Sequence, residues 1–311
     1  MKKVRSAGIS IIFVLLALFS LFAYADVEEV INKQYPLERD GAVRLKNISG
    51  NIAVTTWDKN EIKIEARKRA DSQKELDKIH VDIDSHDSRI SINTEYDKSF
   101  HFNFFSGFDG NRSSVDYELI VPDKAEISLE SVSGDIRVSS IGGDLKSKTV
   151  SGGIKVVSAV KDVTANSVSG SIYLEGAADD ATLETVSGKI TVNELMGAVS
   201  AKTVSGGIDL MSGSEVKGAR AETVSGSIRA KYILGHGVHS YKSVSGGIRI
   251  ELPADSGFSV TAKTFSGSIN TDFAITLSGK IDNKNIKGIA GNGGPELSLE
   301  SFSGSIMVEK R

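Results

Sequence analysis

Short runs of alternating apolar and polar residues recur along most of the chain, and a serine–glycine pair interrupts each run. In one such unit Val163 and Ala165 precede the pair, Ile172 and Leu174 follow it, and polar residues fill the positions between them. Alternation with a period of two is typical of β-strands that bury one face. Each unit is therefore predicted to be a strand, a bend at the glycine, a second strand and a turn.

These units return at a nearly constant interval. The glycine of the pair falls at Gly50, Gly134, Gly152, Gly170, Gly188, Gly206, Gly226, Gly246, Gly267 and Gly304. From Gly134 to Gly206 each step is 18 residues, and the next three steps are 20, 20 and 21 residues. A fixed period near 20 is the signature of a stacked array. Because one unit cannot bury its inner face alone, we expect successive corners to line up along one axis, with equivalent strands paired in parallel.

The handedness of this array follows from its connections. Parallel strand–crossover–strand connections are overwhelmingly right-handed. The rival is a left-handed hexapeptide helix, which needs an apolar residue at every sixth position. The positions twelve residues beyond the first corner valines instead carry Asp144, Asp162 and Asp180. We therefore predict an all-β, right-handed parallel β-solenoid (β-helix) with about 18–20 residues per coil.

The corner itself has a constant composition. Glycine suits the bend because it accepts a positive φ without a Cβ clash. A hydroxyl residue stands three positions before most of the glycines, at Ser131, Thr149, Ser167, Thr185, Thr203 and Thr223. We expect these hydroxyls to stack as a ladder, but the pattern leaves open whether the hydroxyl or the following valine points inward. Phe265 and Phe302 replace the valine in two late units and are expected to fill a wider terminal coil.

Residues 26–125 are less regular. Alternating strands are predicted at 41–57, 60–69, 80–84, 89–96 and 115–122. Ser72 and Glu75 form a capping-box pattern that opens a short helix with Leu76 and Ile79 on one face. We assign residues 26–125 to the first coils and an irregular N-terminal cap, and 126–311 to the repeat solenoid. A separate small β domain is the alternative for the N-terminal part.

Residues 1–25 have the features of a targeting segment. Lys2, Lys3 and Arg5 are followed by an apolar stretch at 9–22, and Ala23-Tyr24-Ala25 supplies a small-residue cleavage site. This pattern predicts a cleaved secretory signal peptide and a location in the periplasm, at the cell surface or outside the cell. An uncleaved anchor is the alternative, although the apolar stretch is shorter than the ~20 residues that span a bilayer.

Composition adds three constraints. The chain has no cysteine, so its stability must come from packing and backbone pairing. Loss of the three basic residues before position 25 takes the formal net charge from −3 to −6. A mildly acidic chain of this kind is not expected to bind nucleic acid.

A phenylalanine-rich stretch is the first candidate binding element. The segment FHFNFFSGFDG contains Phe102, Phe104, Phe105 and Phe108. A contiguous apolar loop can dock a partner, and membrane contact is conceivable only through this loop. Equally, the loop can fold over the open end of the solenoid, where unpaired strand edges must be covered.

Other candidate sites have structural explanations. Asp144, Asp162 and Asp180 on adjacent coils could bind Ca²⁺, but aspartate at a turn commonly bonds to backbone instead. The serine of the repeated pair recurs without a histidine in register, so a nucleophile is not expected. His236 and His239 are three residues apart, which places them on opposite faces of a strand. No metal, cofactor or catalytic residue is predicted.

At this point the residues match a known family. The phrase T/S-V-S-G-x-I-x-V, the strand VDYELIVP and the tail G-x-G-G-x-x-L-x-L-x-S-F-S-G-S-I resemble the bacterial β-strand-repeat family called domain of unknown function 4097, also named "putative adhesin". The resemblance covers nearly all of the chain after residue 25. It implies an exported or envelope-associated β-solenoid, and some relatives are tied to envelope stress responses. It assigns no catalytic residues.

These observations lead to a ranked functional prediction. We predict an exported, non-enzymatic β-solenoid that acts as a binding, adhesion or scaffolding module at the bacterial cell envelope, with an envelope or surface protein or glycan as its partner. The alternative is an envelope-stress sensor or regulator that acts by protein contacts. A polysaccharide lyase or hydrolase is the third reading. Such chemistry needs clustered acids or bases at a break in the repeat, and the coils from Gly134 to Gly246 contain no insertion of that kind.

Overall fold

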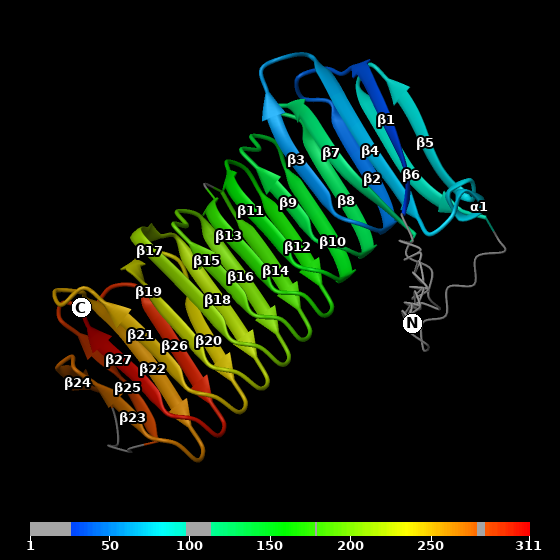
Figure 1. Cartoon of the computed structure of the whole chain (residues 1–311). Helices are drawn as coiled ribbons and strands as arrows, with labels where there is room; N and C mark the ends of the chain where they lie inside the picture. Colours follow the sequence, from blue (N-terminus) through cyan, green and yellow to red (C-terminus); the bar gives the residue numbers. More distant parts are fainter. Residues whose placement is uncertain (1–25, 98–112, 178, 279–283) are drawn as a thin grey trace, which may run out of the picture.

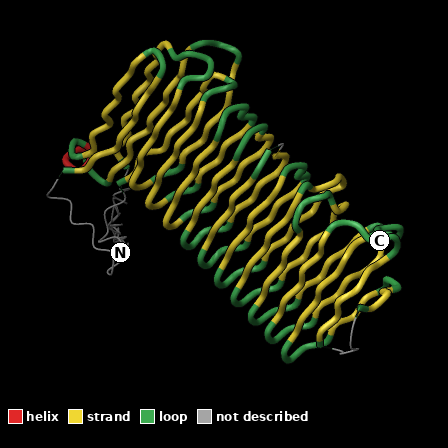
Figure 2. Tube along the Cα trace, turned by 180° about the vertical axis from the view of Figure 1, so that it is seen from behind, coloured by secondary structure: helices red, strands yellow, loops and turns green. Residues whose placement is uncertain are grey.

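The chain forms a long rod built from two facing sheets (Figures 1 and 2). The computed structural model describes residues 26–97, 113–177, 179–278 and 284–311. In these ranges the strands form a 13-stranded sheet and a 14-stranded sheet, called sheet A and sheet B below. No helix in these ranges is long and apolar enough to cross a membrane. The expected all-β solenoid is confirmed.

Each central coil gives one strand to sheet B and, after the glycine corner, one strand to sheet A. The sheet B strands are β8 (Glu126–Ser133), β10 (Leu145–Ser151), β12 (Val163–Ser167), β14 (Ala181–Thr185), β16 (Ala198–Thr203), β18 (Gly218–Thr223) and β20 (His239–Ser243). The sheet A strands are β9 (Ile136–Ser139), β11 (Ile154–Ala159), β13 (Ile172–Ala177), β15 (Ile190–Asn193), β17 (Ile208–Val216), β19 (Ile228–Leu234) and β21 (Ile248–Leu252). Neighbouring coils pair in parallel at a shift of one repeat, so that Leu145 faces Val163.

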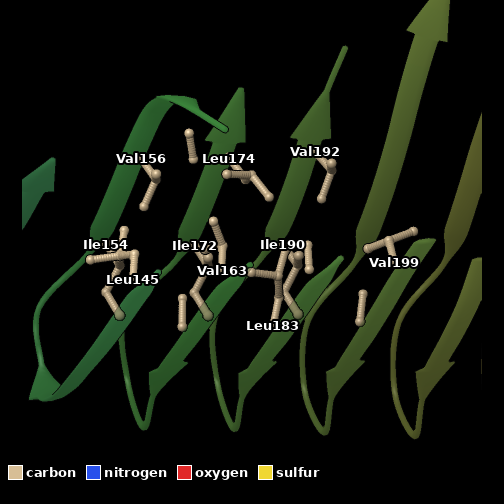
Figure 3. Packing of buried hydrophobic residues seen from close by; sticks show 14 of the residues in the cluster. Leu145, Ile154, Val156, Val163, Ile172, Leu174, Leu183, Ile190, Val192 and Val199 are labelled. Atoms are coloured by element: carbon tan, nitrogen blue, oxygen red, sulfur yellow. The ribbon is translucent and has the colours of Figure 1, made fainter. Parts of the chain in front are cut away.

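The core consists of columns of apolar residues between the two sheets. Ile154, Ile172 and Ile190 occupy equivalent positions in sheet A, and each is at most 1% exposed. Figure 3 shows this column together with Leu183, which comes from the facing sheet. Each coil contributes only a few such side chains. The core therefore exists only because coils stack, as the alternating pattern requires.

The N-terminal end is built around one coil of the same type. It contains β1 (Val27–Pro36), β2 (Ala42–Ser49), β3 (Ile52–Trp57), β4 (Glu61–Ala70), β5 (Ile79–His86), β6 (Arg89–Tyr96) and β7 (Ser114–Pro122). Strands β2 and β3 pair in parallel with β8 and β9, so the first coil shares both sheets with the repeats. Strands β6 and β7 stack outside this coil, and β4, β1 and β5 complete the end in antiparallel pairing.

The predicted capping box forms a short helix at this end, α1 (Gln73–Leu76). The Ser72 hydroxyl accepts a hydrogen bond from the Glu75 backbone N–H at 3.3 Å, which satisfies one free donor of the first turn. Leu76 is buried, as expected. Ile79 is also buried, but it begins strand β5 instead of extending the helix.

The last coils stack out of sequence order. They contain β22 (Phe258–Thr264), β23 (Ile269–Thr271), β24 (Ile275–Leu277), β25 (Asn285–Ala290), β26 (Glu296–Ser301) and β27 (Ile306–Lys310). Strand β26 lies between β20 and β22, and β27 lies between β21 and β23. The corners therefore follow one another as Gly246, Gly304 and Gly267. The corners still line up along one axis, as expected, but at this end their order along the axis differs from their order in the chain.

Charge explains why this order is favourable. The Lys242 ammonium lies 3.4 Å from a Glu300 carboxylate oxygen, and Lys263 is paired with Glu300 on its other side. In chain order Lys242 would stand directly beside Lys263. Like charges directly opposite one another destabilise a strand pair, whereas opposite charges stabilise it. The intercalated coil therefore restores the alternation of charge along sheet B.

At the corners, a buried hydroxyl of one coil bonds the glycine of the preceding coil. Eight Ser or Thr hydroxyls donate to a glycine carbonyl at 2.9–3.5 Å; the donors are Thr149, Ser167, Thr185, Thr203, Thr223, Ser243, Ser301 and Thr264. The hydroxyls point inward, which answers the question that the sequence left open. From Thr149 onward the hydroxyl ladder is thus a series of hydroxyl-to-carbonyl bonds that joins each coil to the next. Ser131, which was expected to belong to it, is buried but its hydroxyl makes no such bond.

The reason for glycine at these corners differs from the one expected. Among the corner glycines only Gly50 (φ 111°) and Gly134 (φ 138°) have a positive φ. At the others, a Cβ would fall well inside contact distance of the carbonyl oxygen of the neighbouring corner glycine, as at Gly152 against Gly134. Backbone oxygen cannot move aside as a flexible side chain can. Close approach of backbones, not φ, therefore requires glycine along most of the ladder.

Adjacent glycines in one corner provide a direct test. A Gly152→Ala variant places its Cβ against the Gly134 carbonyl, and we expect it to lose about 1–3 kcal/mol of unfolding free energy, as overpacked sites do. In Gly153→Ala the Cβ meets its nearest atom, the Ser171 carbonyl oxygen, at 3.5 Å, an ordinary contact. This control should change stability by no more than about 1 kcal/mol. Urea denaturation midpoints compare the two, and equal losses would contradict the steric account.

The hydroxyl bond can be tested with an isosteric change. Thr185 is 5% exposed, and its hydroxyl donates to the Gly170 carbonyl at 2.9 Å. Thr185→Val keeps the shape but removes the donor, so we expect a loss of about 1–3 kcal/mol from the unsatisfied carbonyl. Thr185→Ser keeps the donor and should lose less. Thermal and urea unfolding measure both variants, and a valine variant as stable as wild type contradicts the role of the bond.

Candidate functional site

One apolar side chain per coil points outward at the corner. Because the buried hydroxyl faces inward, the next residue along the strand must face solvent. In spatial order these residues are Ile48, Val132, Val150, Val168, Val186, Val204, Val224, Val244, Phe302 and Phe265. We call this set the corner ridge. Backbone hydrogen bonds join neighbouring coils along the ridge; for example, the Ser205 N–H donates to the Val186 carbonyl at 2.8 Å.

The corner ridge accounts for much of the exposed apolar surface. Fourteen large apolar side chains in the described part of the chain are exposed, and seven of them belong to the corner ridge: Val168, Val186, Val204, Val224, Val244, Phe265 and Phe302. Isolated exposed apolar residues are ordinary, whereas contiguous ones mark interaction sites. The ridge is therefore the first candidate for recognition on this rod.

The two phenylalanines of the ridge do not fill the terminal coil, so that expectation is wrong. Phe265 is 68% exposed and Phe302 is 56% exposed. Their rings stack on each other with centroids 4.8 Å apart and an interplanar angle of 8°. The reason is their register: each follows an inward hydroxyl, Thr264 or Ser301, and so faces outward like the valines.

A column of charges runs beside the corner ridge on sheet B, two residues before each ridge position. In spatial order it reads Lys46, Glu130, Lys148, Asn166, Glu184, Lys202, Glu222, Lys242, Glu300 and Lys263. Ion pairs join Lys46 to Glu130 at 3.5 Å and Lys202 to Glu222 at 3.8 Å. We call this column the charge ladder. Each exposed pair contributes only about 0–1 kcal/mol, but the alternation keeps the surface free of a single-sign patch.

Between the corner ridge and the charge ladder the surface is hollowed at both ends of the rod. Near the N-terminal end a hollow of about 700 Å³ has Lys148, Thr149 and Val150 among its lining residues. Near the other end a hollow of about 770 Å³ is lined by the two ridge phenylalanines, by Glu300 and by three lysines, Lys242, Lys263 and Lys284. The Lys284 ammonium donates to the Phe265 carbonyl at 2.9 Å. We call this second hollow the aromatic groove.

The aspartate column lies at the bend opposite the corner ridge. The Asp162 carboxylate accepts a hydrogen bond from the Asp180 N–H at 3.1 Å, and the Asp180 carboxylate accepts one from the Ala198 N–H at 3.1 Å. The carbonyl oxygen of Asp144 accepts from the Ile127 N–H. In the ranges that the structure describes, no group of three or more His, Asp or Glu residues is placed to hold a metal ion. The aspartates connect the turns of adjacent coils.

The predicted phenylalanine cluster is not part of the described structure. Phe102, Phe104, Phe105 and Phe108 fall within residues 98–112, outside the described ranges. The strands on either side of this segment in the sequence, β6 and β7, pair with β2 and β3 of the first coil.

The two histidines singled out by their spacing do not share a strand, as the prediction assumed: His236 is exposed in the bend between β19 and β20, and His239 begins β20 and is fully buried. His239 Nδ1 lies 2.8 Å from the Tyr232 hydroxyl, and its Nε2 lies 3.0 Å from the Gly235 carbonyl. The Tyr241 hydroxyl bonds that of Tyr232. This cluster is a satisfied polar group inside the core, with no route for a substrate.

Burial makes the histidine cluster sensitive to acid. Desolvation lowers the pKa of His239 below its ordinary value of 6.5, although the bond to the Gly235 carbonyl opposes this shift. Burial also raises the pKa of Tyr232 and of Tyr241 above 10, so neither phenol titrates near neutral pH. Below pH 6.5 the unfolded chain binds a proton that the folded chain excludes, and stability must fall as pH falls.

This sign gives a measurable expectation. We expect the contribution of His239 to the unfolding free energy to be complete above pH 6.5 and to decrease as the pH falls below 6.5. His239→Gln should remove most of that slope even if it lowers stability at every pH. His236→Gln, which changes an exposed ring, should leave the slope intact. Urea titrations at several pH values measure this, and an unchanged slope in His239→Gln contradicts the assignment.

Comparisons with known proteins place this geometry in context. A family model described as Toastrack DUF4097 matches residues 42–309. No curated protein matches the chain. A solved "putative adhesin" from Bacteroides fragilis is 17% identical, covers 91% of this chain and 97% of its own, and superposes with a TM-score of 0.42. A solved "putative adhesin" from Parabacteroides distasonis is 12% identical and covers 91% of this chain and 97% of its own, with a TM-score of 0.46.

Proposed function

Because the chain belongs to the Toastrack DUF4097 family, we propose that it is an exported, non-enzymatic binding module of the bacterial cell envelope. The aromatic groove at the end of the corner ridge is its recognition site in this proposal. The observation that carries the proposal is the pair of exposed, stacked rings of Phe265 and Phe302 among three lysines.

The chemistry of the groove suits binding. Aromatic side chains supply large contact area at a low entropic cost and are enriched among the residues that dominate interfaces. Phe265 and Phe302 are held by backbone bonds on a rigid rod, so little ordering is needed on association. The lysines outnumber Glu300 in the lining. The partner expected here is an envelope or surface component that presents an apolar face beside acidic groups.

The same geometry gives little support to an enzyme. The repeated inward hydroxyls are engaged as donors to glycine carbonyls, which leaves them out of reach of any substrate. His239 is enclosed in the core. Export is supported by the pattern of residues 1–25, a basic segment, an apolar stretch and a small-residue site. A regulator acting through protein contacts would use the same exposed surface.

The proposal predicts both a location and a loss of binding. Fractionation of cells that make the full chain should recover it outside the cytoplasm. The purified chain should bind isolated envelope fragments saturably. Phe265→Ser should weaken this binding about tenfold or more, because an anchor aromatic commonly contributes at least 2 kcal/mol.

A matched control distinguishes binding at the aromatic groove from nonspecific binding through exposed apolar side chains. Met196 is 54% exposed and lies on the opposite bend, so Met196→Ser removes an apolar side chain of similar exposure. This variant should bind like wild type. Retention of the chain in the cytoplasm, or equal binding by both variants, contradicts the proposal.

A further inference from the structure

The valine part of the corner ridge has no assigned role in the proposed function. Val168, Val186, Val204, Val224 and Val244 lie on consecutive coils and are uniformly 44–49% exposed. Together they form a straight apolar strip along the middle of the rod. Valine has one strongly preferred χ1 rotamer in regular structure, so burying such a strip costs little side-chain entropy. The strip is therefore suited to form an interface.

The spacing of the strip selects its partner. The rungs follow strands paired in parallel, which lie about 4.8 Å apart. An α-helix repeats every 5.4 Å and slips about half a rung after four coils. In an extended strand, the side chains on one face repeat only every ~6.7 Å. A surface that meets every rung must have the same repeat, and a second copy of this chain has it by construction.

The charge ladder supports the same partner. Two copies that pack antiparallel, one coil short of full overlap, place Lys46 opposite Glu300, Glu130 opposite Lys242 and Lys148 opposite Glu222. Symmetry doubles these three pairs to six. The one pair of like charges is Glu184 with Glu184 of the other copy, at the centre of the interface. A partner with a single-sign surface would meet repulsion at every second rung instead.

We propose that the valine strip of the corner ridge is a homotypic interface, in which two copies pack antiparallel about a two-fold axis that passes through the Val186 rung. Val168 of one copy then faces Val204 of the other, and Val132 faces Val244. Phe265 lies beyond the overlap, whereas Phe302, on which its ring stacks, lies opposite Ile48 of the other copy, so the dimer and the aromatic groove share Phe302. The inference goes beyond the proposed function, because it names a second use of the same edge.

A strip one residue wide buries a modest area. Interfaces of that size are of the weak, reversible kind, so the dissociation constant is expected in about the micromolar range. Sedimentation equilibrium of the purified chain from about 1 to about 300 µM covers this range. Wild type should change from monomer to dimer across it. A chain that stays monomeric at the highest concentration overturns the proposal.

Paired variants locate the interface. Val186→Lys puts a charge on the axis and should weaken dimerisation at least tenfold. Val160→Lys makes the same change at a residue that is 55% exposed on the opposite bend, and it should dimerise like wild type. Lys148→Glu should weaken the dimer, and Glu222→Lys in the same chain should restore it. Equal weakening by the two valine variants contradicts the assignment.

The orientation is tested by disulfide trapping, which is clean because the chain contains no cysteine. Val186→Cys should cross-link to its own copy under mild oxidation, whereas Val244→Cys should not. A mixture of Val132→Cys and Val244→Cys chains should form the mixed dimer. Self-linking of Val244→Cys as fast as Val186→Cys overturns the antiparallel arrangement. Binding of envelope fragments by Phe265→Ser is read separately, so either proposal can fail alone.

Discussion

The hydrogen bond from a buried Ser or Thr hydroxyl to a glycine carbonyl of the preceding coil is the contact from which the rest of this structure follows. It joins backbones that lie so close that a Cβ at Gly152 or its equivalents has no room. It also turns the hydroxyl inward, as at Thr185, and so turns Val186 outward. One short-range contact thus determines the stacking, the composition of the corner and the character of the exposed edge.

Most of the architecture could be predicted because its signals are local and repeated. The interval between corners predicted the parallel register, and the Ser72 capping pattern predicted α1. The direction of the valines could not be predicted in the same way. A buried hydroxyl is acceptable only where it has an acceptor, and here that acceptor belongs to another coil. The reason for glycine was missed on the same ground, since the atom that excludes a Cβ lies in a neighbouring repeat.

The order of the last coils shows a second limit. Repeats of one pattern can stack on one another in several orders, because their core columns are nearly interchangeable. What distinguishes the orders is small: a glutamate between Lys242 and Lys263 in place of two adjacent lysines. Such differences are each worth a fraction of a kcal/mol to about one, but they add along a rigid ladder. The charge ladder therefore helps to determine the order in which the coils stack, in addition to forming part of the exposed surface.

Nothing in the corner contact requires the ridge to be apolar. The ridge position faces solvent, and its side chain takes no part in the hydroxyl–carbonyl bonds. A preference for β-branched residues would be met by threonine as well as by valine. Threonine does occur at other outward positions of sheet B, such as Thr164 and Thr182, yet at none of the ten ridge positions. Where valine is replaced near the C-terminal end, the substitute is phenylalanine, which is not β-branched but has a larger apolar surface. The shared property of the ridge is therefore its apolar character. On an exposed edge of the rod, that property favours contact with a partner that buries it.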